Sequence, residues 1–152
     1  MSERRKIGPH ELWREADTGL VGMTTVGMVE ENHAIAILAT VKDFTESLGP
    51  DEPFLMLADA RQAGGVSSGA RRIYATQTPT GRPAYVSIFG VTFMFRVALQ
   101  LVFKAIAIAS SNKFAVRIEE TEADARAWLL KQAAEWRAGK RSNASRDSRV
   151  GE

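Results

Sequence analysis

Apolar and polar positions follow a period of two in several stretches, which is typical of β-strands. Short alternation at 11–17 and β-branched residues at 20–29 predict two strands, and a turn at 17–19 makes them a hairpin. The continuous apolar run at 53–60 predicts a strand covered on both faces, with its end at Asp59. Later strands are predicted at 84–89 and 113–119.

Between these strands the apolar positions recur with the helical spacing of three and four residues. In the stretch that ends at Leu48, the apolar side chains that share one helical face are Ala34, Ile37, Leu38, Val41, Phe44 and Leu48. A loop at 61–66, which contains Gly64 and Gly65, is predicted to lead into a helix at 67–75, and a further helix is predicted at 91–109. Thr121 can cap a last helix, with Asp124 at the reciprocal capping position. The order ββαβαβαβα predicts an α/β fold with a mixed sheet of about five strands covered by helices.

The helix predicted at 91–109 is more apolar than a surface helix needs to be. Arg96, Gln100 and Lys104 recur every four residues and form one polar stripe along it. The apolar remainder exceeds what a helix buries against a sheet, so either the helix is central and fully buried or the surplus meets a second subunit, a loop, an apolar ligand or a membrane surface. The residues expected at this apolar interface or ligand contact are Phe93, Phe95, Leu99, Val102, Phe103 and Ile106.

At 152 residues, with 45% hydrophobic content, the chain suits a single domain with one core. We expect that domain to cover residues 11–137, between a disordered N-terminus at 1–10 and a disordered basic tail at 138–152. The lack of cysteines excludes disulfides and thiolate chemistry and agrees with a cytoplasmic location. Basic residues near the start have no apolar stretch behind them, and the charges in 91–109 oppose insertion into a bilayer, so we expect neither a signal peptide nor a transmembrane segment.

The excess of positive charge lies at the C-terminal end of the chain and not in the predicted domain. Residues 137–152 contain five basic and two acidic side chains, a net charge of +3, whereas the whole chain carries +2. The preceding residues therefore carry a net charge of −1 and offer no general basic surface to nucleic acid. A tail rich in Ser, Arg and Asn is typical of a disordered, solubilising end, so we expect no nucleic-acid partner.

Functional groups in α/β sheets gather at the carboxyl ends of strands, which directs attention to residues 59–72. Ser67 and Ser68 begin a predicted helix, where backbone N–H groups favour an anion or a phosphate on Ser67. The alternative is that Ser67 is only a helix cap. Asp59 and Arg61 could act as an acid and its electrostatic partner, or the carboxylate could accept N–H groups of the following loop. Together these four residues are the predicted phosphorylation or partner-binding site.

Patterns for catalysis or metal binding are weaker. His10 and His33 have no metal-ligand spacing, and the chain has no cysteine, so we expect neither a metal nor a cofactor. Ser67 would need an oriented base to act as a hydrolytic nucleophile, and nothing along the chain orients His33 for that role. We therefore expect a protein that is not an enzyme, with the Asp59 and Arg61 pair as the one place to look for a reaction.

Three stretches together resemble a STAS domain, the type named for sulfate transporters and anti-sigma-factor antagonists. They are LADARQAGGVSSGARR at 57–72, AYVSIFG at 84–90 and AVRIEETEADARAWL at 115–129. The resemblance extends over about residues 11–131 and is greatest for the small bacterial branch described as STAS-like or CRAL-TRIO-like lipid-binding. It implies a STAS-like fold and a regulatory or ligand-binding role without catalysis.

The resemblance also shows where this chain departs from the family pattern. In anti-sigma-factor antagonists a kinase phosphorylates a serine at the start of the helix after the third strand, within an Asp-Ser-Ser-Gly-like motif. Here residues 66–69 match the serines and the glycine, but Val66 stands at the acidic position, which weakens the expected phosphorylation switch. The long helix at 91–109 resembles the region that covers an apolar cavity or a dimer contact in such proteins.

Two functions follow as hypotheses. The first is a regulatory or scaffolding module that binds a regulatory protein partner and forms a homodimer through the helix at 91–109. The alternative is a carrier or sensor of an apolar, lipid-like small molecule that lies beneath the same helix. A molecule that copurifies with the protein would favour the second hypothesis.

Overall fold

The computed structural model describes residues 3–49, 51–78, 82–109 and 114–150, with the backbone alone at 98, 102, 105–107, 109 and 140–150. The strands are β1 (Glu3–Ile7), β2 (His10–Arg14), β3 (Val21–Val29), β4 (Phe54–Val66), β5 (Ala84–Phe89) and β6 (Phe114–Glu119). The helices are α1 (Glu31–Glu46), α2 (Ser68–Gln77), α3 (Phe93–Ala109) and α4 (Glu122–Val150). Lys113, the first residue of the predicted last strand, lies outside the described residues.

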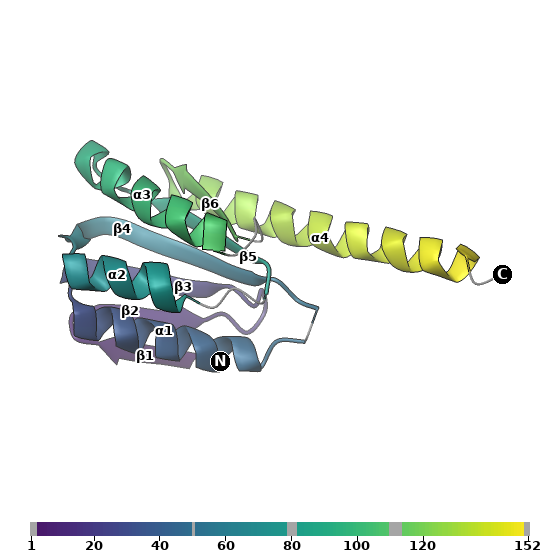
Figure 1. Ribbon diagram of the computed structural model, residues 1–152, viewed down its shortest axis with the longest axis horizontal. Coiled ribbons are helices and arrows are strands. Elements are labelled where there is room, and N and C mark those ends of the chain that lie inside the picture. Colours follow the sequence, from purple (N-terminus) through teal and green to yellow (C-terminus); the bar gives the residue numbers. More distant parts are fainter. Residues whose placement is uncertain (1–2, 50, 79–81, 110–113, 151–152) are drawn as a thin grey trace.

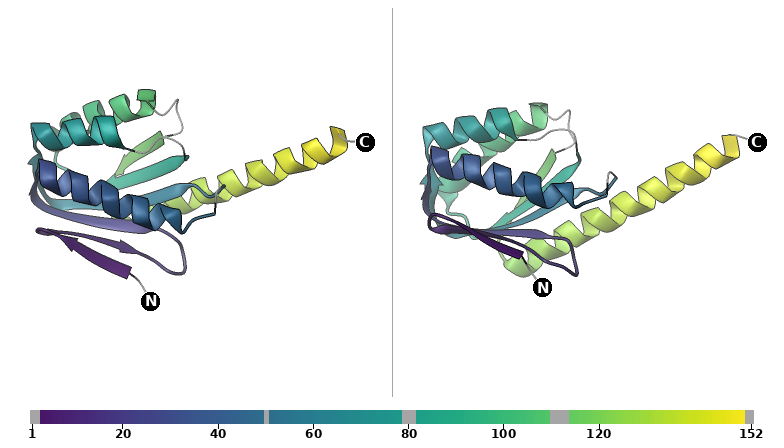
Figure 2. Two further views of the ribbon diagram at one scale, coloured as in Figure 1. Left: turned by 60° about the horizontal axis from the view of Figure 1, so that its bottom comes forward. Right: turned by 90° about the horizontal axis from the view of Figure 1, so that it is seen from below.

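These strands form one sheet in the order β1-β2-β3-β4-β5-β6 (Figure 1). The first two pairs are antiparallel, and β3 to β6 are parallel to one another. Each parallel crossover moves one strand further in the same direction with the same hand, so α1, α2 and α3 cover one face of the sheet. Helix α4 covers the other face, over β4, β5 and β6 (Figure 2). The predicted mixed α/β sheet is therefore confirmed.

The N-terminal residues form a strand at the edge of this sheet. We predicted disorder over 1–10, but residues 3–7 form β1 and pair along their whole length with β2, so the sheet has six strands instead of five. The ladder of backbone hydrogen bonds stabilises this edge strand, and Arg4 adds an ion pair with Glu11 of β2. Charged side chains are common on edge strands, so the lack of an apolar pattern did not indicate disorder here.

Strand β4 is longer than the sequence predicts. We expected its end at Asp59 and a loop at 61–66, but these residues continue the strand beside β3 through two register shifts. Gly64 approaches the Gly27 backbone so closely that a Cβ atom at Gly64 would lie 3.0 Å from the Gly27 carbonyl carbon. The glycines that suggested a loop therefore permit a close approach of two strands.

Helix α4 also extends beyond its predicted end. The tail at 138–152, which we expected to be disordered, is helical as far as Val150 and runs away from the body of the molecule (Figure 1). Thr121 caps the start of the helix as predicted, since its hydroxyl accepts the Asp124 N–H at 3.1 Å. No proline interrupts this segment, although its glycine, serine and asparagine residues are weak helix formers. The polar composition of the tail indicated a solvent-facing segment but not its conformation.

The predicted hairpin between β2 and β3 is present and anchors α4. The Glu15 N–H donates to the Leu20 carbonyl at 2.9 Å across the turn. The Glu15 carboxylate accepts two hydrogen bonds from the Arg126 guanidinium of α4, at 2.7 and 2.9 Å. These bonds lower the pKa of Glu15 below its ordinary value. The hairpin thus fixes the N-terminal part of α4 against the sheet.

Alternate residues of the strands point to opposite faces, so the sheet separates two apolar clusters. The cluster under α4 contains the buried residues Leu20, Leu55, Leu57, Phe89, Ala125, Leu129 and Ala133. The cluster under α1, α2 and α3 includes the strand residues Phe54, Met56, Ala58, Ala60, Val86 and Ile88. The second cluster is incompletely packed. The cavity that remains there is the candidate site.

Candidate functional site

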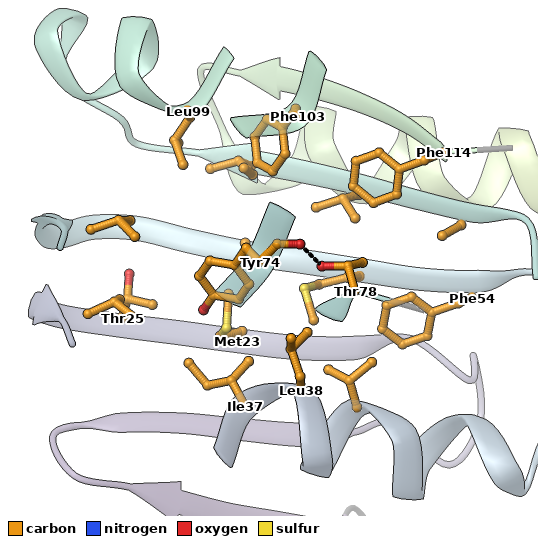
Figure 3. A pocket seen from close by; sticks show the side chains of 18 of the residues that line it. Met23, Thr25, Ile37, Leu38, Phe54, Tyr74, Thr78, Leu99, Phe103 and Phe114 are labelled. Atoms are coloured by element: carbon orange, nitrogen blue, oxygen red, sulfur yellow. Dashed lines mark hydrogen bonds between the residues drawn. The ribbon is translucent and has the colours of Figure 1, made fainter. Parts of the chain in front are cut away.

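An apolar cavity of about 400 Å³ lies between the sheet and the helices α1, α2 and α3 (Figure 3). Its floor consists of alternate side chains of β3, β4 and β5, among them Met23, Met56, Ala58, Ala60 and Val86. Its walls come from the helices and include Ile37, Leu38, Val41, Tyr74, Leu99 and Phe103. Small-molecule sites typically measure roughly 300 to 1,000 Å³ and have mostly apolar linings, so this cavity has the size and character of a ligand site.

Small residues and a short helix create this space. Helix α2 has ten residues, of which only Ala70 and Ile73 are buried. It packs mainly against α1 and α3 and makes little contact with the sheet. At Ala58 and Ala60, the side chain on the floor of the cavity is only a methyl group. Protein interiors are otherwise close-packed, so an apolar gap of this size is a distinct feature of the fold.

The polar groups of the lining lie at separate places. Tyr74 crosses the middle of the cavity with its hydroxyl toward Met23, and Thr25 lies on the same side (Figure 3). Neither hydroxyl is hydrogen-bonded to another described residue. Burial raises the pKa of Tyr74, so its hydroxyl stays protonated and can donate a hydrogen bond. Arg82 lines the end of the cavity where β4 and β5 begin.

Helix α3 turns one face toward the cavity. Phe95, Leu99 and Phe103 belong to the lining, and Leu99 is buried. The Phe103 ring also lies 6.0 Å from the ring of Phe114 in β6, measured between centroids. The structure therefore places three of the residues predicted at an apolar contact beside the cavity.

The outer face of α3 carries exposed apolar side chains. We predicted that Phe93 shares a contact with Phe95 and Leu99, but Phe93 is 77% exposed and does not line the cavity. At about 100° per residue, positions 93 and 95 point in nearly opposite directions from the helix axis. The side chains of Val102 and Ile106, from the same prediction, lie outside the described part of the chain. The large exposed side chains of this outer face are Phe93, Met94, Val97, Leu101 and Ile108.

Asp59 and Arg61 lie on the sheet face opposite the cavity. The Asp59 carboxylate accepts the Arg61 backbone N–H at 3.0 Å and two hydrogen bonds from its guanidinium, at 3.0 and 2.7 Å. The guanidinium holds the pKa of Asp59 below its ordinary value. The pair lines a second hollow, of about 360 Å³, together with Arg4, Glu11 and Trp13. A carboxylate engaged in this way positions Arg61, which favours a structural role.

Ser67 caps α2, which is the simpler of the two predicted alternatives. Its hydroxyl accepts the Ala70 N–H at 3.1 Å. Ser68 is exposed in the first turn of the helix. The Glu31 carboxylate of α1 lies beside this helix start, since a Cβ atom at Gly69 would lie 2.8 Å from its oxygen. A phosphate on Ser67 would therefore approach a carboxylate that already pairs with Arg72, at 3.3 Å.

The four residues predicted as one phosphorylation or partner-binding site do not meet. Asp59 and Arg61 line the hollow on the α4 side, whereas Ser67 and Ser68 begin a helix on the other side of the sheet. The extra length of β4 is the reason, because it separates Asp59 from the strand end. The sequence had suggested that this end and the carboxylate coincide.

Tyr74 and Arg82 are cavity residues that the sequence pattern did not indicate. Tyr74 belongs to a short polar helix, and Arg82 belongs to a turn-rich connection, so neither follows an apolar period. One usable signal was present in β4, where Ala58 and Ala60 occupy alternate positions of a strand predicted to be covered on both faces. Two small residues on one face of a buried strand indicate missing volume on that face.

The histidines contact each other, with His10 Nε2 and His33 Nδ1 3.2 Å apart. His10 Nδ1 also accepts the Val26 N–H at 3.0 Å, and burial lowers the pKa of His10. Among the described residues, no cluster of three or more acidic or histidine side chains could hold a metal ion. In the same part of the chain, no helix has both the length and the apolar character needed to cross a bilayer.

Comparisons with known proteins identify the fold. No family model matches the sequence, and no curated protein matches it. The chain is similar to a solved structure from Shewanella loihica PV-4, an uncharacterised protein of the DUF3478 family with a SpoIIAA-like fold. The TM-score is 0.52 at 13% identity, and the match covers 85% of this chain and 95% of that one. The chain has a STAS-like fold.

This likeness confirms the resemblance to STAS domains that the three sequence stretches suggested. It extends to the fold alone, because 13% identity does not transfer the role of individual residues. The cavity and the two faces of α3 are therefore the features of this chain that bear on its function.

Proposed function

We propose that this STAS-like chain is a non-enzymatic binding module whose cavity takes an apolar small molecule, as a carrier or a sensor. The observation that supports this function is the cavity of about 400 Å³, with its mostly aliphatic and aromatic lining. An unfilled apolar space weakens a fold, because the side chains around it lose dispersion contacts. An apolar occupant would restore these contacts.

Helix α3 supports the same proposal. Its inner face lines the cavity through Phe95, Leu99 and Phe103, so a movement of this helix would change access to the space. Its sequence is rich in apolar residues on the outer face as well, and Phe93 and Leu101 are 77% and 68% exposed. A helix with few fixed contacts on one side is suited to act as a lid.

The lining favours binding over catalysis. The described lining provides the Tyr74 phenol and the Arg82 guanidinium as its ionisable groups, and neither is a general base near neutral pH. The hydroxyls of Thr45 and Thr78 also line the cavity, and both donate hydrogen bonds to backbone carbonyls of their own helices. These groups can orient a ligand, but they do not form a nucleophile with its activating base.

The proposal is tested with a neutral fluorescent probe, phenylnaphthylamine, whose emission rises in an apolar site. We expect saturable binding to the parent chain and displacement by aliphatic alcohols. Ala60→Leu places a larger side chain in the cavity and should weaken probe binding at least about tenfold, whereas Ala39→Leu on the exposed face of α1 should not. No saturable binding, or equal binding by both variants, would contradict the proposal.

A second candidate function is association with a protein partner, in the simplest case another copy of the chain. The observation in its favour is the exposed apolar face of α3, where Met94 and Ile108 are 78% and 73% exposed. Exposed apolar side chains that lie close together on a soluble domain often mark an interface. A homodimer through this face would leave the cavity available for its ligand.

Light scattering after size exclusion tests the second candidate. We expect a dimer that Leu101→Ser converts to a monomer, while Leu130→Ser on the exposed side of α4 leaves it unchanged. Leu99→Asp is not a suitable variant, because Leu99 lines the cavity and a carboxylate there would affect folding. A monomer at high micromolar concentration would rule out self-association through α3.

A further inference from the structure

Arg82 is the cationic side chain of the cavity lining, within the part of the chain that the structure describes. It lies two positions before β5 and is half-buried. Its Nη1 donates to the carbonyls of Gly49 and Glu52, at 2.6 and 2.5 Å. Both acceptors belong to the connection between α1 and β4, so these bonds fix the guanidinium at one end of the cavity.

No carboxylate among the described residues neutralises this guanidinium. The Glu52 side chain, whose backbone carbonyl Arg82 holds, pairs with Arg137 at 3.3 Å. The Nε and Nη2 atoms of Arg82 make no hydrogen bond with the described protein. Arginine carries five N–H donors and stays charged, so a half-buried guanidinium with free donors is suited to an anion.

We infer that the ligand is an amphipath whose carboxylate head pairs with Arg82 while its apolar tail lies along the floor formed by β3, β4 and β5. The inference rests on the proposed function, since without an apolar occupant Arg82 would serve only to hold the connection between α1 and β4. A guanidinium can form two parallel N–H···O bonds with a carboxylate. The donors that Arg82 has available for such a pair are on adjacent nitrogens, Nε and Nη2.

The remainder of the cavity suits a tail and not a second charge. Apart from Arg82, the polar side chains of the lining carry the neutral hydroxyls of Thr25, Thr45, Tyr74 and Thr78. The floor follows β4 from Phe54 to Ala60, a path of about 20 Å at 3.3 Å per residue. An extended acyl chain could follow this path from the charged end toward Thr25.

The test compares four amphipaths of ten carbons each that differ in the head: decanoate, decyl phosphate, decanol and decylammonium. Each is titrated calorimetrically into the full chain at about pH 8, where the carboxylate is fully ionised. We expect decanoate to bind about tenfold or more tightly than decanol, and decylammonium to bind more weakly than decanol. A clear preference for decyl phosphate over decanoate would overturn the choice of a carboxylate.

Variants of the guanidinium provide the second part of the test. Arg82→Gln should bind decanol as the parent does and lose the preference for decanoate, whereas Arg82→Lys keeps the charge and should keep part of the preference. Arg71→Gln, at an exposed position of α2 outside the cavity lining, is the matched control and should change neither affinity. Should Arg82→Gln fail to fold, the ranking of the four heads on the parent chain still decides the question.

The outcomes separate the inference from the proposed function. Equal binding of decanoate and decanol would overturn the inference and leave an apolar site in place. A preference for decanoate that survives in Arg82→Gln would also overturn it, because another group would then hold the head. If none of the four ten-carbon compounds binds, both the inference and the proposed function fail.

Discussion

The two faces of the sheet share the same strands but differ in how completely they are packed. Under α4, large strand residues such as Leu57 and Phe89 pack against a helix that presents Ala125, Leu129 and Ala133. The hollow on this side lies at the edge of that cluster and is also lined by the charged residues Asp59 and Arg61. Under α1, α2 and α3, small residues of the same strands meet a short helix that stands away from the sheet. A cavity of about 400 Å³ remains on that side.

The comparison shows how one strand can serve two purposes. Along β4, the residues that face α4 include Leu55 and Leu57, whereas the residues that face the cavity include Ala58 and Ala60. Because side chains alternate, each face can be chosen independently of the other. We infer that the α4 face mainly supplies stability and that the opposite face gives up part of its stability to keep a site open.

The largest expected difference between the two faces follows the loss of one leucine from each. Leu129→Ala, at a fully buried position under α4, should lower the free energy of unfolding by about 2 to 5 kcal/mol. Leu99→Ala should cost clearly less, because Leu99 borders space that is already empty. Chemical denaturation measures both values, and equal losses would refute the difference in packing.

Adding volume should have opposite effects on the two faces. Ala133→Leu forces a larger side chain into the cluster under α4 and should cost about 1 to 3 kcal/mol. Ala60→Leu points into the cavity and should be neutral or stabilise the protein by about 0.5 to 2 kcal/mol. Thermal unfolding distinguishes them, and destabilisation by both variants to the same extent would mean that the cavity is closed in solution.

The cap of α2 provides a smaller test on the cavity face, because this helix makes little contact with the sheet. Ser67→Ala should lower the free energy of unfolding by about 1 kcal/mol, since the Ala70 N–H loses its acceptor. Ser67→Asp, which imitates phosphorylation, keeps an acceptor but adds a charge near Glu31. It should therefore be less stable than the parent.

Glu31→Gln provides the control for this charge effect. In that background Ser67→Asp should regain the stability of a good helix cap. A pull-down with a protein partner, measured for Ser67→Ala and Ser67→Asp, tests the predicted phosphorylation switch. Unchanged partner binding by both variants would leave Ser67 as a helix cap alone.

As the pH is lowered, the contribution of the cavity face to folding stability should decrease at a higher pH than that of the α4 face. The pKa of His10 is lowered by burial, so the unfolded chain, with an ordinary value of about 6.5, binds the proton more readily. Stability should therefore fall as pH decreases from about 7 to 5, and His10→Asn, which keeps an acceptor for Val26, should remove this part of the dependence. Denaturation at several pH values gives the measurement.

The carboxylates on the α4 face become protonated, and lose their contribution to stability, in a lower pH range. Glu15, which binds α4 through Arg126, and Asp59 both have lowered pKa values, so their contributions are present near neutral pH and are lost only below about pH 4.5. Stability that is flat between pH 7 and 5 in the parent chain would contradict the role assigned to His10.

The sequence by itself determined most of the secondary structure and the fold class. The helix cap at Thr121, the turn of the hairpin and the strand at 84–89 depend on neighbouring residues, so local patterns were enough to predict them. The apolar surplus of 91–109 indicated more apolar surface than a helix buries against a sheet, and Phe93, Met94 and Leu101 of α3 are exposed, but the pattern did not indicate which side chains face the sheet. Disorder was predicted incorrectly at both ends, because an edge strand and a solvent-facing helix need no apolar period.

Only the tertiary structure decided where the site lies. The distance between α2 and the sheet depends on how α1 and α3 pack beside it, and no local pattern encodes that distance. The same packing brings Tyr74 and Arg82, eight positions apart, into one lining. The continuation of β4 to Val66 separates Asp59 from Ser67. A cavity is a property of several elements together, because its volume is what their side chains fail to fill.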